Sequence, residues 1–182
     1  MARIQLITDK TDLPADRYEE FDAICAVLGS VAGPFSVLFH SPGLAQKVME
    51  AGAHVRLNSL LTMIERELVV LSVAREKDAA AEWSGHVRIA RTAGMREDAI
   101  VAIRDRKAAD NLEPDERDII TFVRQLLRTN RVDQMLFDRL LERHGVRWLV
   151  ELAATAGQYQ YISAITGTFD LQPAPGAELL PR

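Results

Sequence analysis

Glu82 and His86 are the residues of this sequence whose types and spacing best suit acid–base chemistry. They lie in the stretch from Ala79 to Gly94, which has the pattern of a single helix, and they are one helical turn apart. Their stripe of the helix is otherwise apolar, whereas Arg88 points away from it. An unpaired carboxylate or imidazole on the core side of a helix costs several kcal/mol. The pattern therefore predicts either a buried polar network or an active site.

Glu67 is a second acidic residue that we expect to point inward. It belongs to a predicted helix over residues 61–77, which is apolar on almost every side and should therefore be central. A helical wheel places Glu67 with Ile64 and Leu71, whereas Glu65 lies on the outer side. Two consecutive helices with a tight connection pack against each other, which can bring Glu67 near His86. We therefore predict a cluster of Glu67, Glu82 and His86.

Such a cluster has the groups needed to move a proton to and from carbon. One carboxylate would orient the imidazole and fix its tautomer, and the other group would act on the substrate. We therefore name His86, Glu82 and Glu67 as candidate catalytic residues. A substrate carboxylate would also need a cation, for which Arg56 and Arg75 are the nearest candidates.

Two other interpretations of the same cluster stay open. Glu82 and His86 with Glu67 could supply three ligands to a divalent metal, but this spacing is common and we expect no metal. The three groups could also form a satisfied buried network that only holds helices or subunits together.

The aromatic residues Trp83 and Tyr159 are further candidates for contact with a substrate. Trp83 lies at the edge of the Glu82 and His86 stripe, where core or interface packing is the more common role. Tyr159 shares a face of the last predicted helix with polar residues such as Thr155 and Ser163, and these could line a cavity.

The rest of the chain predicts one all-α domain. Helical patterns cover residues 15–32, 42–56, 95–106, 113–130, 133–144 and 147–169, while residues 35–40 are too short a run to assign. Residues 1–14 read as an extended N-terminal arm, residues 15–170 as a single helical domain, and residues 171–182 as an irregular tail rich in proline. With 182 residues, the chain is long enough for one well-buried core.

Composition limits the classes of function. The chain is 48% hydrophobic and 26% charged with a net charge of −4, so no nucleic-acid or membrane partner is indicated. Its first ten residues lack the long apolar core of a signal peptide, and we expect a cytoplasmic protein. The single cysteine, Cys25, excludes an internal disulfide and any chemistry that needs two thiols in one chain. Its place on an apolar helix face suggests a core residue.

The run Glu82-Trp-Ser-Gly-His86 with the nine residues after it resembles the carboxymuconolactone decarboxylase family, whose fold includes alkylhydroperoxidase D. Three further segments resemble the same family in the same order, at residues 66–75, 112–118 and 151–159. The resemblance covers about residues 41–170. It implies an alkylhydroperoxidase D-like helical bundle, a homo-oligomer, and a cofactor-free enzyme that acts on a small lactone acid of aromatic catabolism.

The sequence departs from the peroxidase branch of that family at the reactive thiols. That branch carries Cys-x-x-Cys-x-x-x-His, and the two cysteine positions correspond here to Ala79 and Glu82, while His86 and Glu67 match the histidine and the relay glutamate. A dithiol peroxidase needs one thiolate to attack the peroxide and a second thiol to resolve the product. The first hypothesis is therefore a lyase or isomerase that acts on a small-molecule substrate. The alternatives are an oxidoreductase that uses Cys25 or an external thiol, and a noncatalytic ligand-binding oligomer.

Overall fold

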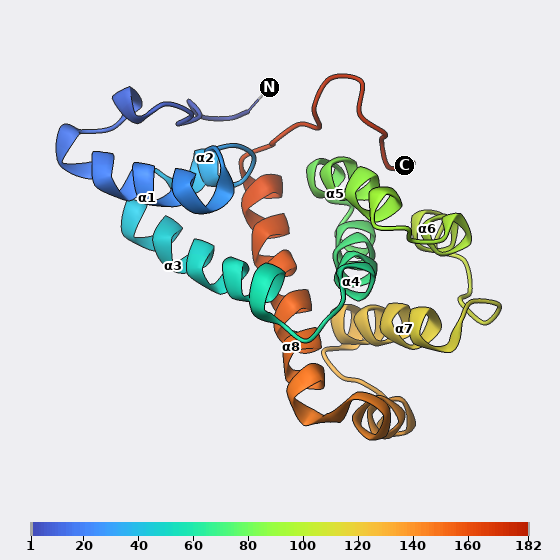
Figure 1. The fold of residues 1–182 in the computed structure, drawn as a ribbon. Coiled ribbons are helices and arrows are strands. Elements are labelled where there is room, and N and C mark those ends of the chain that lie inside the picture. The colour runs from blue at the N-terminus through green and yellow to red at the C-terminus, as the bar shows by residue number, and fades with distance from the viewer. Residues whose placement is uncertain (1, 182) are drawn as a thin grey trace.

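The computed structural model describes residues 2–181, and the secondary structure of this part is entirely helical. The central helix is α4 (Met63–Glu76), which packs against α5 (Ala80–Thr92), α6 (Glu97–Arg104), α7 (Pro114–Thr129) and α8 (Gln134–Thr168). Figure 1 shows α4 surrounded by these helices. The all-α prediction is confirmed.

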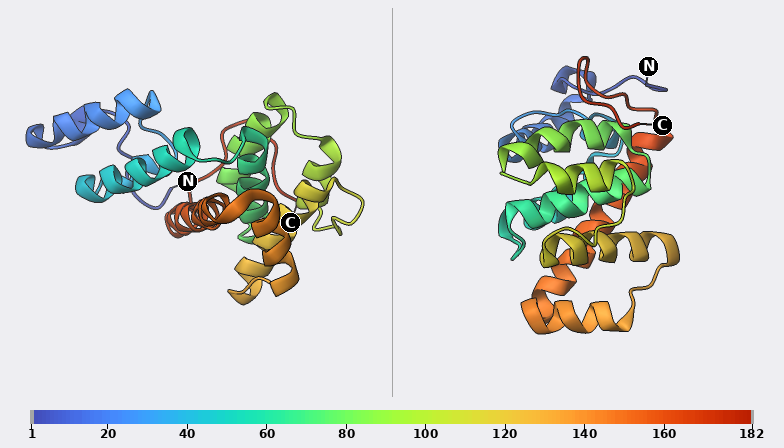
Figure 2. Two further views of the ribbon diagram at one scale, coloured as in Figure 1. Left: turned by 60° about the horizontal axis from the view of Figure 1, so that its bottom comes forward. Right: turned by 90° about the vertical axis from the view of Figure 1, so that its right-hand side faces the viewer.

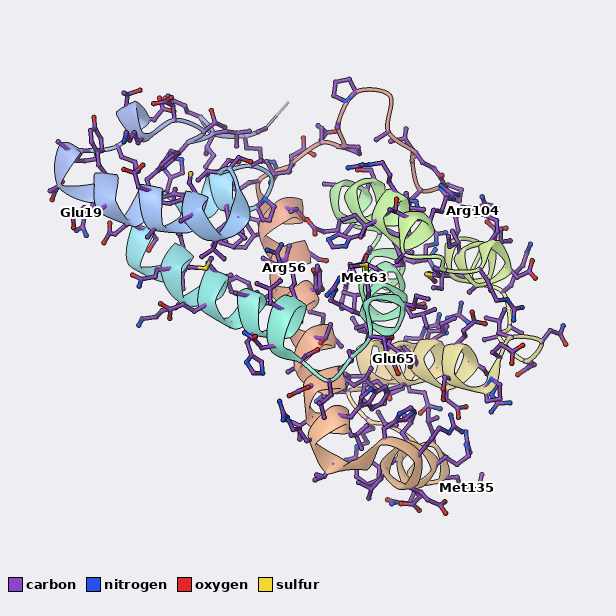
Figure 3. The ribbon with its side chains drawn as sticks, viewed as in Figure 1. Glu19, Arg56, Met63, Glu65, Arg104 and Met135 are labelled. Carbon is purple, nitrogen blue, oxygen red and sulfur yellow. The ribbon has the colours of Figure 1, made fainter. Side chains whose placement is uncertain are left out.

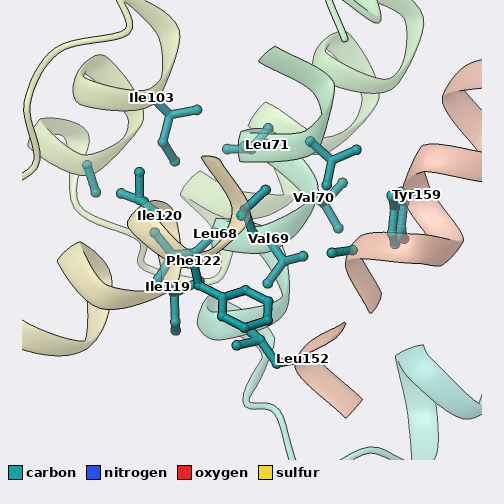
Figure 4. Close-up of a cluster of buried hydrophobic side chains, with 14 of the residues drawn as sticks. Leu68, Val69, Val70, Leu71, Ile103, Ile119, Ile120, Phe122, Leu152 and Tyr159 are labelled. Carbon is teal, nitrogen blue, oxygen red and sulfur yellow. The ribbon is translucent and has the colours of Figure 1, made fainter. Parts of the chain in front are cut away.

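The largest core lies around α4, because this helix presents apolar side chains in nearly every direction. Leu68, Val69, Val70 and Leu71 are all at most 1% exposed and meet side chains from α6, α7 and α8 (Figure 4). Burial of a leucine or valine side chain is worth about 1.5–3 kcal/mol each. The helix that carries Glu67 is therefore buried between α5, α6, α7 and α8.

Local signals explain where the helices begin and end. Thr62 and Glu65 form a capping box at the start of α4, and Asp133 caps α8 by accepting from two backbone amides. Gly94 follows α5 in a left-handed conformation with φ of 87°, which glycine adopts without steric cost. Glu82 and His86 lie inside α5, and Gly94 marks the end of this helix.

The N-terminal part forms a second, smaller core. It contains α1 (Tyr18–Leu28), α2 (Phe35–Leu38) and α3 (Pro42–Ala53), and α3 continues into a π-helical turn, η3 (His54–Asn58). Apolar residues of these elements pack against the last turns of α8 at Ile162. Figure 1 and the left view of Figure 2 show α1 and α3 on the side of α8 that faces away from α6 and α7.

The structure differs from the sequence predictions at several boundaries. The first helix ends at Gly29, which has a φ of 80°, rather than at residue 32, and Phe35–Leu38 forms a short helix. The two helices predicted before and after residue 145 are both present, and they join within α8 at a kink, where Gly145 has non-helical φ and ψ angles. Short 3₁₀ helices, η1 (Lys10–Asp12) and η2 (Ala15–Arg17), interrupt the segment before α1.

Both terminal segments lie against the helices of their own chain. The backbone amide of Arg3 donates to Phe169 O, and that of Ile7 donates to Ser36 O. The tail after α8 returns over α5, where the Arg91 guanidinium pairs with the Glu178 carboxylate at 2.6 Å (Figure 1). None of the helices in residues 2–181 combines the length and the apolar character that a membrane crossing requires.

Candidate active site

Glu67 and His86 form a direct hydrogen-bonded pair between α4 and α5. His86 Nδ1 lies 2.8 Å from Glu67 Oε2, and the Glu67 side chain is 1% exposed. The other carboxylate oxygen, Oε1, accepts from Arg66 Nε at 3.4 Å. An ionised carboxylate can only accept hydrogen bonds, so it places the ring proton of a neutral His86 on Nδ1. The pair thus leaves Nε2 with a free lone pair.

The ring of His86 is held in place by Tyr159 of α8. The two rings meet edge to face, with centroids 5.1 Å apart and planes at 88°. Within residues 2–181, no side chain or backbone group hydrogen-bonds to His86 Nε2, whereas the residue lines a cavity. The nitrogen is therefore the atom of this pair that a ligand can reach.

Glu82 lies one turn before His86 and has a different environment from Glu67. It is 8% exposed, and within residues 2–181 its carboxylate makes no hydrogen bond. Burial raises the pKa of the Glu82 carboxyl, and the charge of His86 opposes this effect in part. A carboxyl group with a raised pKa retains its proton at higher pH, so Glu82 is suited to donate a proton.

A cavity of about 260 Å³ opens onto Glu82 and His86. Its walls come from the α1–α2 connection, α3, α5 and α8. Among the described residues that line it, Arg56 in η3 is the one arginine or lysine. Figure 3 shows Arg56 beside α8, from which Gln158 and Tyr159 enter the same wall. The cavity thus combines one cation with an acid, an imidazole and a phenol.

The Tyr159 hydroxyl lies in this wall as a neutral donor. Burial, together with the nearby negative charge of Glu67, raises the pKa of Tyr159 above its ordinary value. The side chain is 7% exposed and lines the cavity. It can therefore donate a hydrogen bond to an oxygen atom of a bound ligand.

The structure does not bring Arg75 or Trp83 to this cavity. Arg75 lies at the far end of α4, where it donates to Asp78 Oδ1 at 3.0 Å and to the carbonyl of Pro181 at 2.9 Å. Trp83 is 0% exposed and belongs to the main core. Both expectations of substrate contact are corrected, since one residue anchors the C-terminal tail and the other fills the bundle.

The remaining alternatives also depend on where side chains lie. Cys25 packs beside the smaller core on α1 and is not among the described residues that line the cavity. In residues 2–181, no group of three histidine, cysteine or acidic side chains is arranged to hold a metal ion. The geometry of the site therefore favours neither a thiol nor a metal centre.

Several wall residues were not foreseen from the sequence. Gln158 donates to the backbone carbonyl of Val48 at 3.3 Å, and this bond ties α8 to α3 at the cavity. Gly52 lies next to it, and a Cβ there would come within 3.3 Å of Gln158 Nε2. Pro34 and Phe35 enter from the loop before α2. The turn signal at Gly33-Pro34 was visible in the sequence, but it did not indicate which cavity the turn would border.

Comparison with known proteins agrees with this architecture. Residues 42–125 match the carboxymuconolactone decarboxylase family. This segment, just under half of the chain, is similar to the family. The family match begins at α3 and extends into α7, so it includes Glu67, Glu82, His86 and Arg56. Tyr159 and the first two helices lie outside it, and no curated protein matches the sequence significantly.

Solved structures with the same fold cover nearly the whole chain. A peroxidase-related protein from Ralstonia eutropha JMP134, described as an alkylhydroperoxidase AhpD core, has a TM-score of 0.77 at 18% identity, covering 96% of this chain and 93% of its own. A peroxidase-related protein from Silicibacter sp. TM1040 has a TM-score of 0.74 at 16% identity, covering 96% and 92%. The debrominase Bmp8, in complex with 2,3,4-tribromopyrrole, has a TM-score of 0.71 at 16% identity, covering 96% and 95%. These similarities establish an alkylhydroperoxidase D-like fold for this chain.

Proposed function

We propose that this protein is an acid–base enzyme, a lyase or an isomerase, that acts on a small organic acid or lactone. The observation that carries the proposal is the cavity onto which His86 opens while Glu67 holds the opposite ring nitrogen at 2.8 Å. A network that served only to hold helices together would not need a free imidazole nitrogen in a cavity wall. The proposal uses groups of the chain itself and requires no cofactor.

Each polar group of the cavity has a role in such a reaction. His86 Nε2 accepts a proton from a substrate carbon, and Glu67 stabilises the imidazolium that forms. Glu82 in its protonated form delivers a proton to a second atom of the substrate, so that an isomerisation is balanced. In a decarboxylation, CO₂ leaves a substrate carbon, and this carbon keeps the electron pair of the broken bond. The same carbon then receives the proton from Glu82. Arg56 pairs with a carboxylate, and Tyr159 donates to a carbonyl oxygen.

The thiol-based alternative receives less support. A peroxidase or a reductive dehalogenase that worked through a cysteine would need the thiol in the cavity, whereas Cys25 packs elsewhere and the positions on α5 are Ala79 and Glu82. The structural neighbours include a debrominase with a bound bromopyrrole, so the fold can hold a small planar ring. That feature is also compatible with a lactone.

The test is a turnover screen with a matched set of variants. Wild-type protein is incubated with a panel of small lactone acids and unsaturated organic acids, and CO₂ release and double-bond absorbance are recorded. For any substrate that turns over, His86→Gln should lower kcat/KM by about 10²–10⁴, the range that general acid–base catalysis contributes. Glu67→Gln should lower kcat while KM changes little, because the amide no longer stabilises the imidazolium.

The control is Cys25→Ser, which should leave turnover unchanged. Circular dichroism and thermal melting of each variant separate loss of activity from loss of folding. Full activity in a folded His86→Gln protein would contradict the proposal, and so would strict dependence of turnover on Cys25.

A further inference from the structure

A second cavity is also lined by Glu82 and His86. It has a volume of about 520 Å³ and shares Pro34, Glu82 and His86 with the first cavity. Its remaining walls come from the N-terminal arm, from α5 at Gly85, and from the last turn of α8 with the tail that follows. Glu82 and His86 therefore line both cavities, which we call the first and the second compartment. Arg56 lines the first compartment and does not line the second.

The second compartment is suited to an uncharged group. Among the described residues that line it, none is an arginine or a lysine, and Leu6 and Leu171 contribute apolar surface. The hydroxyl hydrogens of Ser36, Ser84 and Thr166 are used within the chain, where they donate to backbone carbonyls. A carboxylate placed there would find no arginine or lysine and would lie beside Glu82, which makes its desolvation costly.

The C-terminal tail forms part of the wall of this compartment, and its last residues are bound to α4 and α5. Arg91 pairs with Glu178 at 2.6 Å, and Arg75 donates to the carbonyl of Pro181 at 2.9 Å. The arm is held by the hydrogen bond from the Ile7 amide to Ser36 O. A wall that is already ordered costs less free energy when a ligand binds, so the compartment is preorganised.

We infer that the substrate is a monocarboxylic acid that spans both compartments. Its carboxylate pairs with Arg56 in the first, and an uncharged, largely apolar group of several carbon atoms occupies the second, so that the reacting carbon lies between them at His86. This assignment rests on the proposed function and narrows it, because it favours amphipathic monoacids over diacids and over acids of two or three carbons.

Calorimetric titration with a graded set of acids tests this assignment on the wild-type protein. The probes are acetate, hexanoate, 4-phenylbutanoate and the diacid adipate. Hexanoate and 4-phenylbutanoate should bind at least tenfold more tightly than acetate, since each methylene that is removed from water contributes up to roughly fourfold. Adipate should bind at least tenfold more weakly than hexanoate, which has the same chain length.

Gly85 allows the second compartment to be filled without strain. It lies in α5 between Glu82 and His86, and a Cβ added there meets nothing within 4 Å. Leucine also favours a helix more than glycine does, so Gly85→Leu should fold. This variant should lose the tenfold gain for 4-phenylbutanoate and keep the wild-type affinity for acetate. Gly43→Leu is the matched control, because Gly43 is also a helical glycine with open space around it and lines neither compartment.

The outcomes separate this inference from the proposed function. Equal affinity for acetate and hexanoate, or equal affinity for hexanoate and adipate, would overturn the two-compartment assignment and leave the acid site intact. A chain-length gain that persists in Gly85→Leu would overturn it as well. By contrast, Arg56→Gln without any effect on acetate or hexanoate binding would contradict the carboxylate site itself.

Discussion

Glu67 and Glu82 are the same residue type in two very different settings. Glu67 is almost completely buried, but it receives hydrogen bonds from His86 Nδ1 and Arg66 Nε. Glu82 is nearly as buried, but within the described chain no hydrogen-bond donor contacts its carboxylate. An unpaired buried carboxylate disfavours the folded state when it is ionised. Glu82 therefore lowers the stability of the protein at the pH at which it is charged.

Replacement of Glu82 by glutamine should stabilise the fold in a pH-dependent way. Because burial raises the pKa of Glu82 in the folded state, the folded chain binds this proton more tightly than the unfolded chain. The free energy of unfolding therefore falls as the pH rises through the window above the unfolded value. Glu82→Gln should match the wild type near pH 4 and melt at a higher temperature by pH 8, by roughly 2–4 °C for each kcal/mol regained.

Melting curves recorded by differential scanning fluorimetry from pH 4 to 8 measure this difference. Glu19→Gln on the exposed side of α1 is the control for the removal of a carboxylate that is not buried. A Glu82→Gln protein that melts below the wild type at pH 8 would show that Glu82 makes a stabilising interaction in the folded chain.

Some site residues could be placed from the local sequence pattern, and others could not. The helical wheel places Glu67 on the inner side of α4, and the spacing of Glu82 and His86 puts both on one side of α5. The wheel does not show which end of a helix borders a cavity, so Arg75 was grouped with Arg56 although it pairs with Asp78 at the opposite end of α4. Gln158 comes from a helix about 70 residues later in the chain, a separation that no local pattern spans.

Helix α8 is the element that joins the two cores. Its later turns contact α4 and α5, contribute Tyr159 to the cavity and place Ile162 in the smaller N-terminal core. The sequence His144-Gly145 predicts a break before this part, and the structure has a kink there. At Gly145 φ is 81° and ψ is 168°, a combination that is accessible almost exclusively to glycine.

Two glycine-to-alanine changes in α8 should have opposite effects on stability. Gly145→Ala forces a Cβ into a left-handed conformation and should cost about 1–3 kcal/mol. Gly157→Ala lies in regular helix with nothing within 4 Å of the added Cβ, and it should gain up to about 1 kcal/mol. Chemical denaturation of both variants measures the two changes. Equal effects would mean that the kink is not required for the fold.

Short elements were the least predictable parts of the fold. Phe35–Leu38 spans four residues, too few to show a helical period, and the π-helical turn over His54–Asn58 depends on hydrogen bonds that follow no sequence pattern. That turn nevertheless carries Arg56. The long helices with strong periodicity could be predicted from the sequence, whereas the turn that brings Arg56 to the cavity could not.

At the scale of the whole molecule, several of the exposed apolar residues lie in two segments, residues 57–63 and 146–150. Leu57, Leu60, Met63, Val146 and Val150 are each 49–68% exposed. Glu151 brings their two segments together, because it accepts from the backbone amide of Leu60 and pairs with His54 and Arg147. We name these five residues the apolar patch. Contiguous exposed apolar surface of this kind is typical of an interface between protein chains.

We expect this patch to mediate the homo-oligomer that the family resemblance implies. Light scattering on the eluted protein should give a mass that is a multiple of 20.3 kDa for the wild type. Leu57→Lys combined with Val146→Lys introduces two charges into the patch, whose burial without partners is costly, so the mass should fall to that of one chain. Met135→Lys is the control, because Met135 is 70% exposed and lies apart from Met63 of the patch (Figure 3). A wild type that elutes as a single chain, or a double variant that stays assembled, would contradict the assignment of this patch.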